Sequence, residues 1–220
     1  MIILIGNEKG GVGKSTLAIN LAVARALKGK DILLVDTDKQ RSSLTFLKIR
    51  QRIKELPRIH MAEHSGDIYE TLKDLSSRYE EIIVDAGGSD SIELRTAMIA
   101  ADKMIIPLKA SQIDNWAIAQ MNALVADVKK RANRDLQAYS VISMAPTNPV
   151  ITEEEDTKLN LQDYSQIPLL KTVIRERKIY RDSIIEGKGV LELEVSNKAK
   201  SEIKELEKEV FEKVMESVNE

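Results

Sequence analysis

The sequence contains no cysteine, few aromatic residues and no long apolar run. Without cysteine it can form neither a disulfide nor a thiolate metal site, which excludes iron–sulfur proteins that need cysteine ligands. Aromatic residues make up only 4% of the chain, so we expect an aliphatic core. A membrane-spanning helix needs about 20 apolar residues, and no run approaches that length. The apolar stretch 1–5 is too short for a signal peptide, so we expect a cytoplasmic protein with no membrane partner.

The charges of the chain are nearly balanced, with a formal net charge of -2 at pH 7. This balance gives no overall electrostatic case for nucleic-acid binding, so any contact with DNA must come from a local basic patch. The length of 220 residues falls within the size range of one α/β domain. Because we find no internal repeat, linker or low-complexity segment, we expect one domain over residues 1–220.

A glycine-rich loop at residues 8–16, Glu-Lys-Gly-Gly-Val-Gly-Lys-Ser-Thr, lies between an apolar strand pattern and a helical pattern. Strand, glycine-rich turn and helix form the context that a phosphate-binding loop needs. The glycines let backbone N–H groups turn toward an anion, and the helix N-terminus adds the positive end of its dipole. In such a loop Lys14 reaches the β- and γ-phosphates, and the Ser15 hydroxyl ligates Mg²⁺. The alternative is a glycine-rich turn without a ligand, which Gly-Lys-Ser at this place disfavours.

Aspartates follow two further apolar strand patterns. The run 32–35 leads into Asp36 and Asp38, and the run 82–84 leads into Asp85 and a glycine pair. Ligands of open α/β sheets bind beyond the carboxyl ends of the strands, so these side chains are placed for a metal–phosphate site. An Asx turn with a helix cap is the alternative for the first two aspartates, and a plain strand end with a flexible turn is the alternative for Asp85.

Strand and helix patterns alternate along the rest of the chain, as in α/β proteins. We expect helices over 42–55, 66–79, 91–101, 114–131 and 196–220, and strands over 58–62, 103–107 and 138–143. Another helix is expected to begin at Thr152, which is a good N-cap residue. The only tryptophan, Trp116, is expected to pack against the fold rather than to form a platform for a ligand.

The glycine-rich loop departs from the usual pattern, since Glu8 stands where the first glycine is expected and a second lysine, Lys9, precedes the glycine pair. This spacing resembles the deviant Walker A motif of the ParA/MinD superfamily of dimerising ATPases. The segment 36–40 is similar to the D-x-D-P-Q signature of that family, with Lys39 in place of its proline. Asp-Ala-Gly-Gly at 85–88 looks like the small ParF-type branch of plasmid partition ATPases. The resemblance implies a P-loop NTPase with a three-layer α/β/α fold and a mostly parallel central sheet.

The resemblance also implies roles for individual residues. Lys9 would cross a dimer interface to the phosphates of the partner's nucleotide, Asp36 would hold Mg²⁺ through water, and Asp38 would position the attacking water. The implied catalytic residues are Lys9, Lys14, Asp38 and Asp85, and the implied metal site consists of Ser15, Asp36 and Asp85. The implied nucleotide-binding residues are Lys9, Gly10, Gly11, Val12, Gly13, Lys14, Ser15 and Thr16, with Met144 and Arg175 near the adenine base. Residues 111–114 would lie near the dimer face.

A local basic segment covers residues 171–181, where five cations stand against only Glu176, a balance of +4 (five minus one). The cations are Lys171, Arg175, Arg177, Lys178 and Arg181. We expect them to bind DNA without sequence preference, because a dimer joined by ATP would present two such patches. The alternative is a solvated face or a part in holding nucleotide. The stretch 196–220 has five lysines and seven glutamates, a negative balance that disfavours a MinD-like membrane anchor.

The predicted function is that of a Mg²⁺-dependent ATP hydrolase that forms a homodimer on ATP and drives DNA partition, as plasmid partition ATPases do. The resemblance implies a small centromere-binding partner of the ParB or ParG kind that stimulates turnover, and a cytoplasmic protein associated with the nucleoid. It leaves open whether the dimers polymerise. No helix-turn-helix domain is expected before the first strand. Two alternatives stay open: an ATPase of the same fold that positions another cargo, and a metabolic ATP-dependent ligase or kinase.

Overall fold

Seven strands form one sheet in the computed structural model, which describes residues 1–110, 115–148, 153–195 and 197–212. The strands are β1 (Ile2–Ile5), β2 (Ile32–Asp36), β3 (His60–Glu63), β4 (Glu81–Asp85), β5 (Lys103–Lys109), β6 (Gln137–Ala145) and β7 (Leu169–Arg175). Their order across the sheet is β3-β2-β4-β1-β5-β6-β7, and every neighbouring pair is parallel. The predicted α/β fold is confirmed, and the sheet is parallel throughout rather than mostly so.

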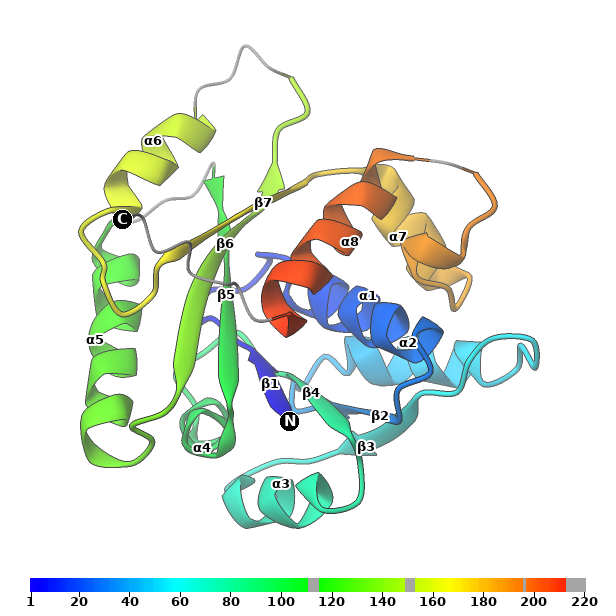
Figure 1. Ribbon diagram of the computed structural model, residues 1–220, viewed down its shortest axis with the longest axis horizontal. Coiled ribbons are helices and arrows are strands. Elements are labelled where there is room, and N and C mark those ends of the chain that lie inside the picture. The colour runs from blue at the N-terminus through cyan, green and yellow to red at the C-terminus, as the bar shows by residue number, and fades with distance from the viewer. Residues whose placement is uncertain (111–114, 149–152, 196, 213–220) are drawn as a thin grey trace, which may run out of the picture.

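Helices cover both faces of this sheet (Figure 1). One face carries α1 (Lys14–Leu27), α2 (Ser42–Arg50), α7 (Lys178–Ile185) and α8 (Lys198–Phe211). The other face carries α3 (Tyr69–Ser76), α4 (Ile92–Ala100), α5 (Asn115–Arg131) and α6 (Glu153–Leu161). A 3-10 helix, η2 (Val190–Glu192), precedes α8. Helical crossovers on both faces produce the predicted three layers.

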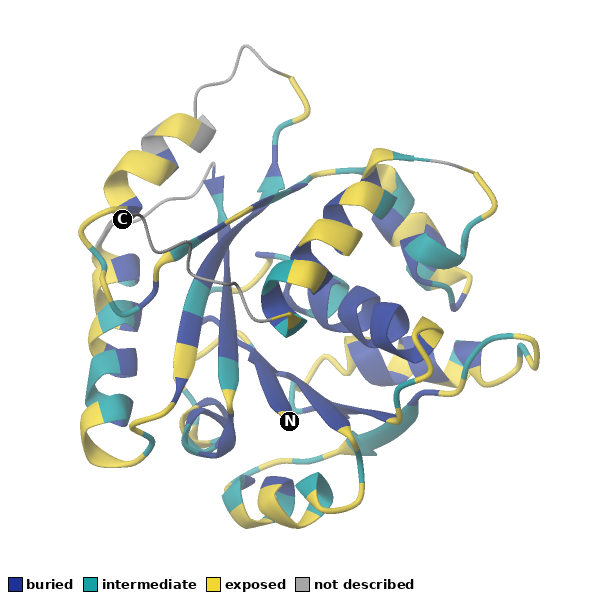
Figure 2. Cartoon of the chain, viewed as in Figure 1, coloured by how far each residue is buried: buried dark blue, intermediate teal, exposed yellow. Residues whose placement is uncertain are grey.

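The core is divided between the two faces because side chains alternate along each strand. In β1, Ile2 and Leu4 pack into the cluster that includes α4 and α5, whereas Ile3 and Ile5 pack into the cluster that includes α1 and α8. Both clusters consist mainly of aliphatic side chains, as expected from the scarcity of aromatic residues. Figure 2 shows the central strands buried, with exposed residues on the outer sides of the helices.

Helix α2 ends at Arg50 rather than at the predicted residue 55. The Arg50 guanidinium donates to the carbonyl oxygen of Pro57 at 2.9 Å and forms a bidentate ion pair with Glu192, at 2.7 Å for each contact. These contacts turn the chain back at the end of the helix, and Ile53, within the predicted helix range 42–55, is only partly buried. The early helix end therefore depends on a partner far away in the sequence.

The predicted packing of Trp116 is wrong, because 69% of its surface is exposed. Helix α5 packs on the sheet through a face that includes Ile118, Met121 and Val125. Trp116 precedes Ile118 by two residues, which is about 200° around a helix, so it lies on the opposite side. The tryptophan is thus an outer residue of the first turn of α5.

Three predictions extend beyond the described residues. The expected helix start at Thr152 and the expected dimer-face residues 111–114 lie outside them, although α6 is described from Glu153. The predicted helix 196–220 is described as α8, Lys198–Phe211, and residues 213–220 lie outside. Within the described residues, no helix is both long and apolar enough to cross a membrane.

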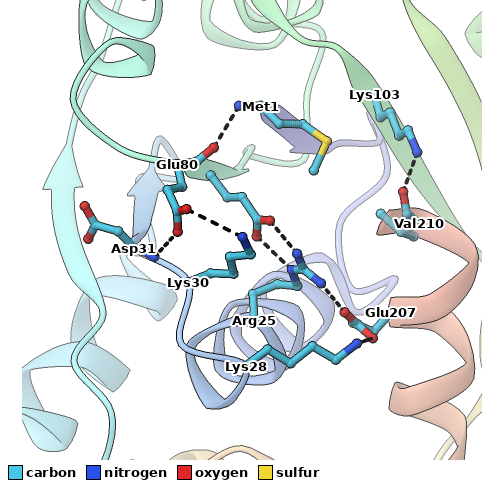
Figure 3. A network of polar contacts seen from close by, with 10 residues as sticks. Met1, Arg25, Lys28, Lys30, Asp31, Glu80, Lys103, Glu207 and Val210 are labelled. Carbon is cyan, nitrogen blue, oxygen red and sulfur yellow. Dashed lines mark hydrogen bonds and ion pairs between the residues drawn. The ribbon is translucent and has the colours of Figure 1, made fainter. Parts of the chain in front are cut away.

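An ion-pair network centred on the buried Arg25 lies at the edge of the sheet where strand β4 begins (Figure 3). Arg25 at the end of α1 donates to both carboxylate oxygens of Glu81, at 2.8 and 2.5 Å, and to Glu207 of α8 at 2.5 Å. Lys28 also pairs with Glu207, and the Arg25 guanidinium lies 4.3 Å from the ring centroid of Phe211. The network joins α1 and α8 to β4, so the helix that begins at the phosphate-binding loop is fixed at its far end.

Candidate functional site

The predicted phosphate-binding loop connects β1 to α1 at the carboxyl edge of the sheet. Its last glycine, Gly13, has a φ of 88°, a left-handed conformation that glycine adopts without strain, and it is the N-cap of α1. No side chain caps this helix end by a hydrogen bond from the N-cap position, and the first turn has no acidic residue. The first N–H groups of α1 therefore suit an anion, whose charge would meet the positive end of the helix dipole.

Lys14 is buried at the base of the loop, where its Nζ atom donates to the carbonyl oxygen of Lys9 at 2.6 Å. Burial lowers the pKa of Lys14, and the nearby carboxylates of Asp85 and Asp38 oppose that shift. The loop is anchored by Asn7, which accepts from the Lys9 N–H at 3.0 Å and donates to the carbonyl oxygen of Pro107 at 2.7 Å. Sequence reasoning missed Asn7, because its partner lies on a different strand.

Asp85 lies at the end of β4, in register with Asp36 of β2. It is fully buried, and burial is the main reason why its pKa rises to about 7. One carboxylate oxygen, Oδ2, accepts from the Ser43 hydroxyl at 2.6 Å, whereas Oδ1 has no hydrogen-bond partner among the described residues. The Ser15 hydroxyl is near enough to lower the pKa of Asp85 without completing a hydrogen bond to Oδ1.

An unpartnered buried carboxylate oxygen beside a loop hydroxyl fits Mg²⁺, which prefers hard oxygen ligands and several waters. Ser15 and Asp85 are therefore the residues that would hold the metal. Asp36 differs, because both its oxygens accept from backbone N–H groups, from Asp38 at 3.0 Å and from Leu44 at 2.9 Å. This is the turn-and-cap alternative, and a role for Asp36 through water stays a prediction.

A cleft of about 610 Å³ opens above the loop. It brings together the phosphate-binding loop, the segment that carries Asp38 and the glycine pair after β4. Its described lining includes Gly10, Gly11, Gly13, Lys14, Ser15, Thr16, Thr37, Asp38, Lys39, Gln40, Gly87, Gly88, Met144 and Arg181. The predicted residue Val12 is buried behind this surface, where its carbonyl oxygen accepts from the Ser143 hydroxyl at 2.5 Å.

The glycine pair after β4 lies directly against the phosphate-binding loop. A Cβ atom on Gly88 would come within 3.0 Å of the backbone of Gly10 and 3.2 Å of the Lys14 Nζ atom. Any side chain at this position would push the two loops apart. A Cβ atom on Gly87 would lie nearest to Asp38, at an ordinary van der Waals distance of 3.7 Å.

A smaller chamber of about 90 Å³ adjoins the cleft. It lies between the end of β6 and the segment from β7 to α7, and its lining includes Gly13, Thr16, Ser143, Met144, Ile174, Arg175, Arg177, Tyr180 and Arg181. Met144 has a φ of 52°, a conformation that costs a non-glycine residue about 1 kcal/mol or more and that recurs at ligand sites. The predicted base contacts Met144 and Arg175 thus line one chamber.

The five predicted DNA-binding cations differ in their surroundings. Arg177 pairs with Glu202 of α8 at 2.7 Å, and Arg175 donates to the carbonyl oxygen of Pro146 at 2.7 Å. Arg181 lines both the cleft and the chamber. Lys171 and Lys178 are the two exposed cations that line neither. Their contact with DNA stays a prediction.

Comparison with known proteins links this site to one family. Among related proteins, maintenance of carboxysome distribution protein A from Halothiobacillus neapolitanus is 26% identical over 211 residues, 94% of each chain. Chromosome partitioning protein ParA from Myxococcus xanthus is 29% identical over 179 residues, 64% of this chain and 63% of that protein. Among solved structures, the ATP complex of the D38A variant of McdA from Cyanothece has a TM-score of 0.74 at 17% identity and covers 94% of this chain and 95% of the other.

The profile of the CobQ/CobB/MinD/ParA nucleotide binding domain, CbiA, matches residues 3–190. This range contains the phosphate-binding loop, the three aspartates and the smaller chamber. Nucleotide as the ligand, predicted from the loop, agrees with the description of that domain, and so does the predicted superfamily. The chain belongs to the CobQ/CobB/MinD/ParA nucleotide-binding domain family.

Proposed function

We propose that the protein hydrolyses ATP with Mg²⁺, forms a homodimer when ATP binds, and uses this cycle to partition DNA. The observation that carries the proposal is the separation of the two lysines of the loop. Lys14 lines the nucleotide cleft, whereas the described lining does not include Lys9. Lys9 is half-buried on the same loop, so a second subunit that faced the cleft would meet it.

The geometry of one subunit supports the hydrolytic part of this proposal. Backbone N–H groups of the loop and Lys14 would hold the phosphates, while Ser15 and Asp85 would hold Mg²⁺, which neutralises phosphate charge when bound. Asp38 lies on the wall of the cleft beside Gly87. It would orient a water whose oxygen bonds to the γ-phosphorus as the bond to ADP breaks. Lys9 of the second subunit would stabilise the charge of that transition state.

DNA as the cargo is supported by the exposed cations Lys171 and Lys178 and by the name of the Myxococcus xanthus relative, a chromosome partitioning protein. Each cation contributes little alone, but a dimer would present both pairs together. A small centromere-binding partner, of the kind implied by the resemblance, would supply sequence specificity and stimulate turnover. The protein would then work at the nucleoid.

Fluorescence anisotropy with an arbitrary labelled duplex tests this function at several salt concentrations. We expect clear binding with ATP, weak binding with ADP, and a log–log salt slope of about -0.9 per phosphate neutralised. Lys171→Ala and Lys178→Ala should weaken binding to every duplex and flatten the slope. Lys130→Ala, which changes an exposed lysine on the opposite face of the sheet, is the matched control. Absence of ATP-dependent binding at low salt would contradict DNA partition.

Positioning of another cargo is the second candidate function. It is favoured by the carboxysome distribution protein of Halothiobacillus neapolitanus, whose alignment covers 94% of both chains. A protein partner that stimulates ATP turnover without DNA would support this candidate over partition. Turnover that requires a small-molecule substrate would instead support a metabolic ligase or kinase.

A further inference from the structure

Arg181 is a cation of the basic segment 171–181 that the proposed DNA contacts leave without a role. Its side chain is exposed on α7, and it forms no hydrogen bond or ion pair with another described residue. It nevertheless lines both the nucleotide cleft and the adjoining chamber. The other two arginines of the segment are engaged, since Arg175 contacts Pro146 and Arg177 contacts Glu202.

The start of α7 is fixed to α8, which sets the direction of Arg181. The buried carboxylate of Glu202 accepts from Arg177 Nε at 2.8 Å and from the Tyr180 hydroxyl at 3.0 Å. It also lies 3.3 Å from the backbone nitrogen of Arg175, which donates to it. Because Arg177 and Tyr180 flank the first turn of α7, this turn cannot rotate freely. Arg181, next to Tyr180, is thus held over the cleft.

The position of Arg181 matches one part of a nucleotide. The cleft and the chamber share Gly13, Thr16, Met144 and Arg181, so these residues mark the junction between the two spaces. A phosphate-binding loop holds the β- and γ-phosphates, and the chamber is the space left for the nucleoside. The α-phosphate therefore falls at the junction. A guanidinium group suits it, because its planar fork can donate to two phosphate oxygens.

We propose that Arg181 is a nucleotide-binding residue that contacts the α-phosphate of bound ATP or ADP. This inference rests on the proposed function, which places the nucleotide in the cleft. Both nucleotides carry an α-phosphate, so both should depend on Arg181 to the same degree. A contact to the γ-phosphate would affect ATP alone, and a contact to DNA would affect neither nucleotide.

Isothermal titration calorimetry with Mg²⁺ tests the proposal on ADP and on a non-hydrolysable ATP analogue. Arg181→Ala should weaken the binding of both nucleotides by a similar factor, roughly tenfold or more, as expected for the loss of a hydrogen bond between charged groups. The nucleotide affinity of Arg181→Lys should lie between those of the wild type and Arg181→Ala, because lysine keeps the charge but lacks the planar fork of donors. Lys204→Ala is the matched control, since Lys204 is an exposed cation on the neighbouring helix α8 that lines neither space.

Each outcome of this titration either supports or overturns the contact between Arg181 and the nucleotide. Unchanged affinity in Arg181→Ala, a loss confined to the ATP analogue, or an equal loss in Lys204→Ala would overturn the role of Arg181. The melting temperature of Arg181→Ala should equal that of the wild type, because the side chain makes no described contact that folding needs. If the wild type binds neither nucleotide, the proposed function fails and the inference fails with it. If the wild type binds and Arg181→Ala binds equally well, only the inference fails.

Discussion

The ammonium group of Lys14 donates to the backbone carbonyl oxygen of Lys9 at 2.6 Å, so the two lysines of the loop are directly linked. The acceptor belongs to the main chain and not to the side chain of Lys9. A nucleotide phosphate that takes Lys14 as its partner would compete with this bond. The state of the loop at Lys9 is therefore coupled to whatever Lys14 binds.

Substitution of Lys14 should remove most of the affinity for ATP. In Lys14→Ala the phosphates would lose a cation while the backbone N–H groups of the loop stay in place, so we expect at least about a tenfold weaker dissociation constant. Titration with a fluorescent ATP analogue measures this. Lys48→Ala, at an exposed position of α2, should bind as the wild type does. Tight binding by Lys14→Ala would contradict the place of Lys14 at the phosphates.

Substitution of Lys9 should separate nucleotide binding from catalysis. Lys9→Ala keeps the carbonyl oxygen that Lys14 contacts, so its own cleft should stay intact and bind ATP. If the side chain acts across a dimer, this variant should remain a monomer with ATP and release phosphate slowly. Static light scattering and a phosphate-release assay, with ATP and Mg²⁺, measure the two properties. Normal dimerisation and turnover in Lys9→Ala would refute the action across the interface.

Asp38→Ala should behave in the opposite way. Association would survive, because the loop and Lys9 are unchanged, whereas the attacking water would lose its orientation. We expect an ATP-bound dimer to accumulate, with turnover reduced by roughly a hundredfold or more, as for loss of a general base. Light scattering should show a dimer that persists after ATP addition. A monomeric Asp38→Ala with normal turnover would exclude this aspartate from the reaction.

The parts of the fold that could be predicted are those specified by neighbouring residues. The stretch from β1 through Gly13 into α1 needs only an apolar strand, glycines and a helical pattern, and all lie within one segment. The position of Asp85 at the end of β4 also follows from its own segment, because an apolar strand pattern directly precedes it. Parallel strands also follow from alternating patterns, because parallel pairing needs crossover connections and a helix between strands supplies one.

The parts that could not be predicted depend on contacts between distant segments. The sequence around Arg177 predicts an unpaired cation, whereas the fold places Glu202 of α8 beside it. Helix α2 stops where Arg50 meets Glu192, 142 residues away in the sequence. The place of Arg181 at the cleft likewise follows from the packing of α7 on α8. No pattern within one segment carries such information.

Removal of Arg25 should destabilise the protein strongly. Its partners Glu81 and Glu207 are buried, and Arg25→Ala would leave Glu81 without a cation and Glu207 with Lys28 alone, for which we expect a loss of about 3–5 kcal/mol in the free energy of unfolding. Urea unfolding measures this loss. Arg78→Ala removes an exposed ion pair with Asp74 and should change stability by less than about 1 kcal/mol. Equal losses in the two variants would show that the network in Figure 3 adds no more than a surface pair.

The buried carboxyl of Asp85 should make stability depend on pH in a defined direction. Its pKa is about 7 in the folded protein and near 3.8 when exposed, so the folded state binds the proton more tightly. The resulting contribution to stability is complete below pH 3.8 and is lost as the pH rises through 7. Over that range the wild type should lose up to about 4 kcal/mol relative to Asp85→Asn, whose amide does not titrate.

Urea unfolding of both proteins at pH values from 4 to 8, without metal or nucleotide, measures that difference. Asp163→Asn, which changes an exposed carboxylate outside the cleft, should follow the wild-type curve throughout. A metal ligand must be deprotonated, so Mg²⁺ with nucleotide should stabilise the wild type more at pH 8 than at pH 5. In Asp85→Asn, the stabilisation by Mg²⁺ with nucleotide should not increase in this way between pH 5 and pH 8. Parallel curves for wild type and Asp85→Asn without ligand would mean that the buried carboxyl titrates as an ordinary aspartate, which would contradict the raised pKa.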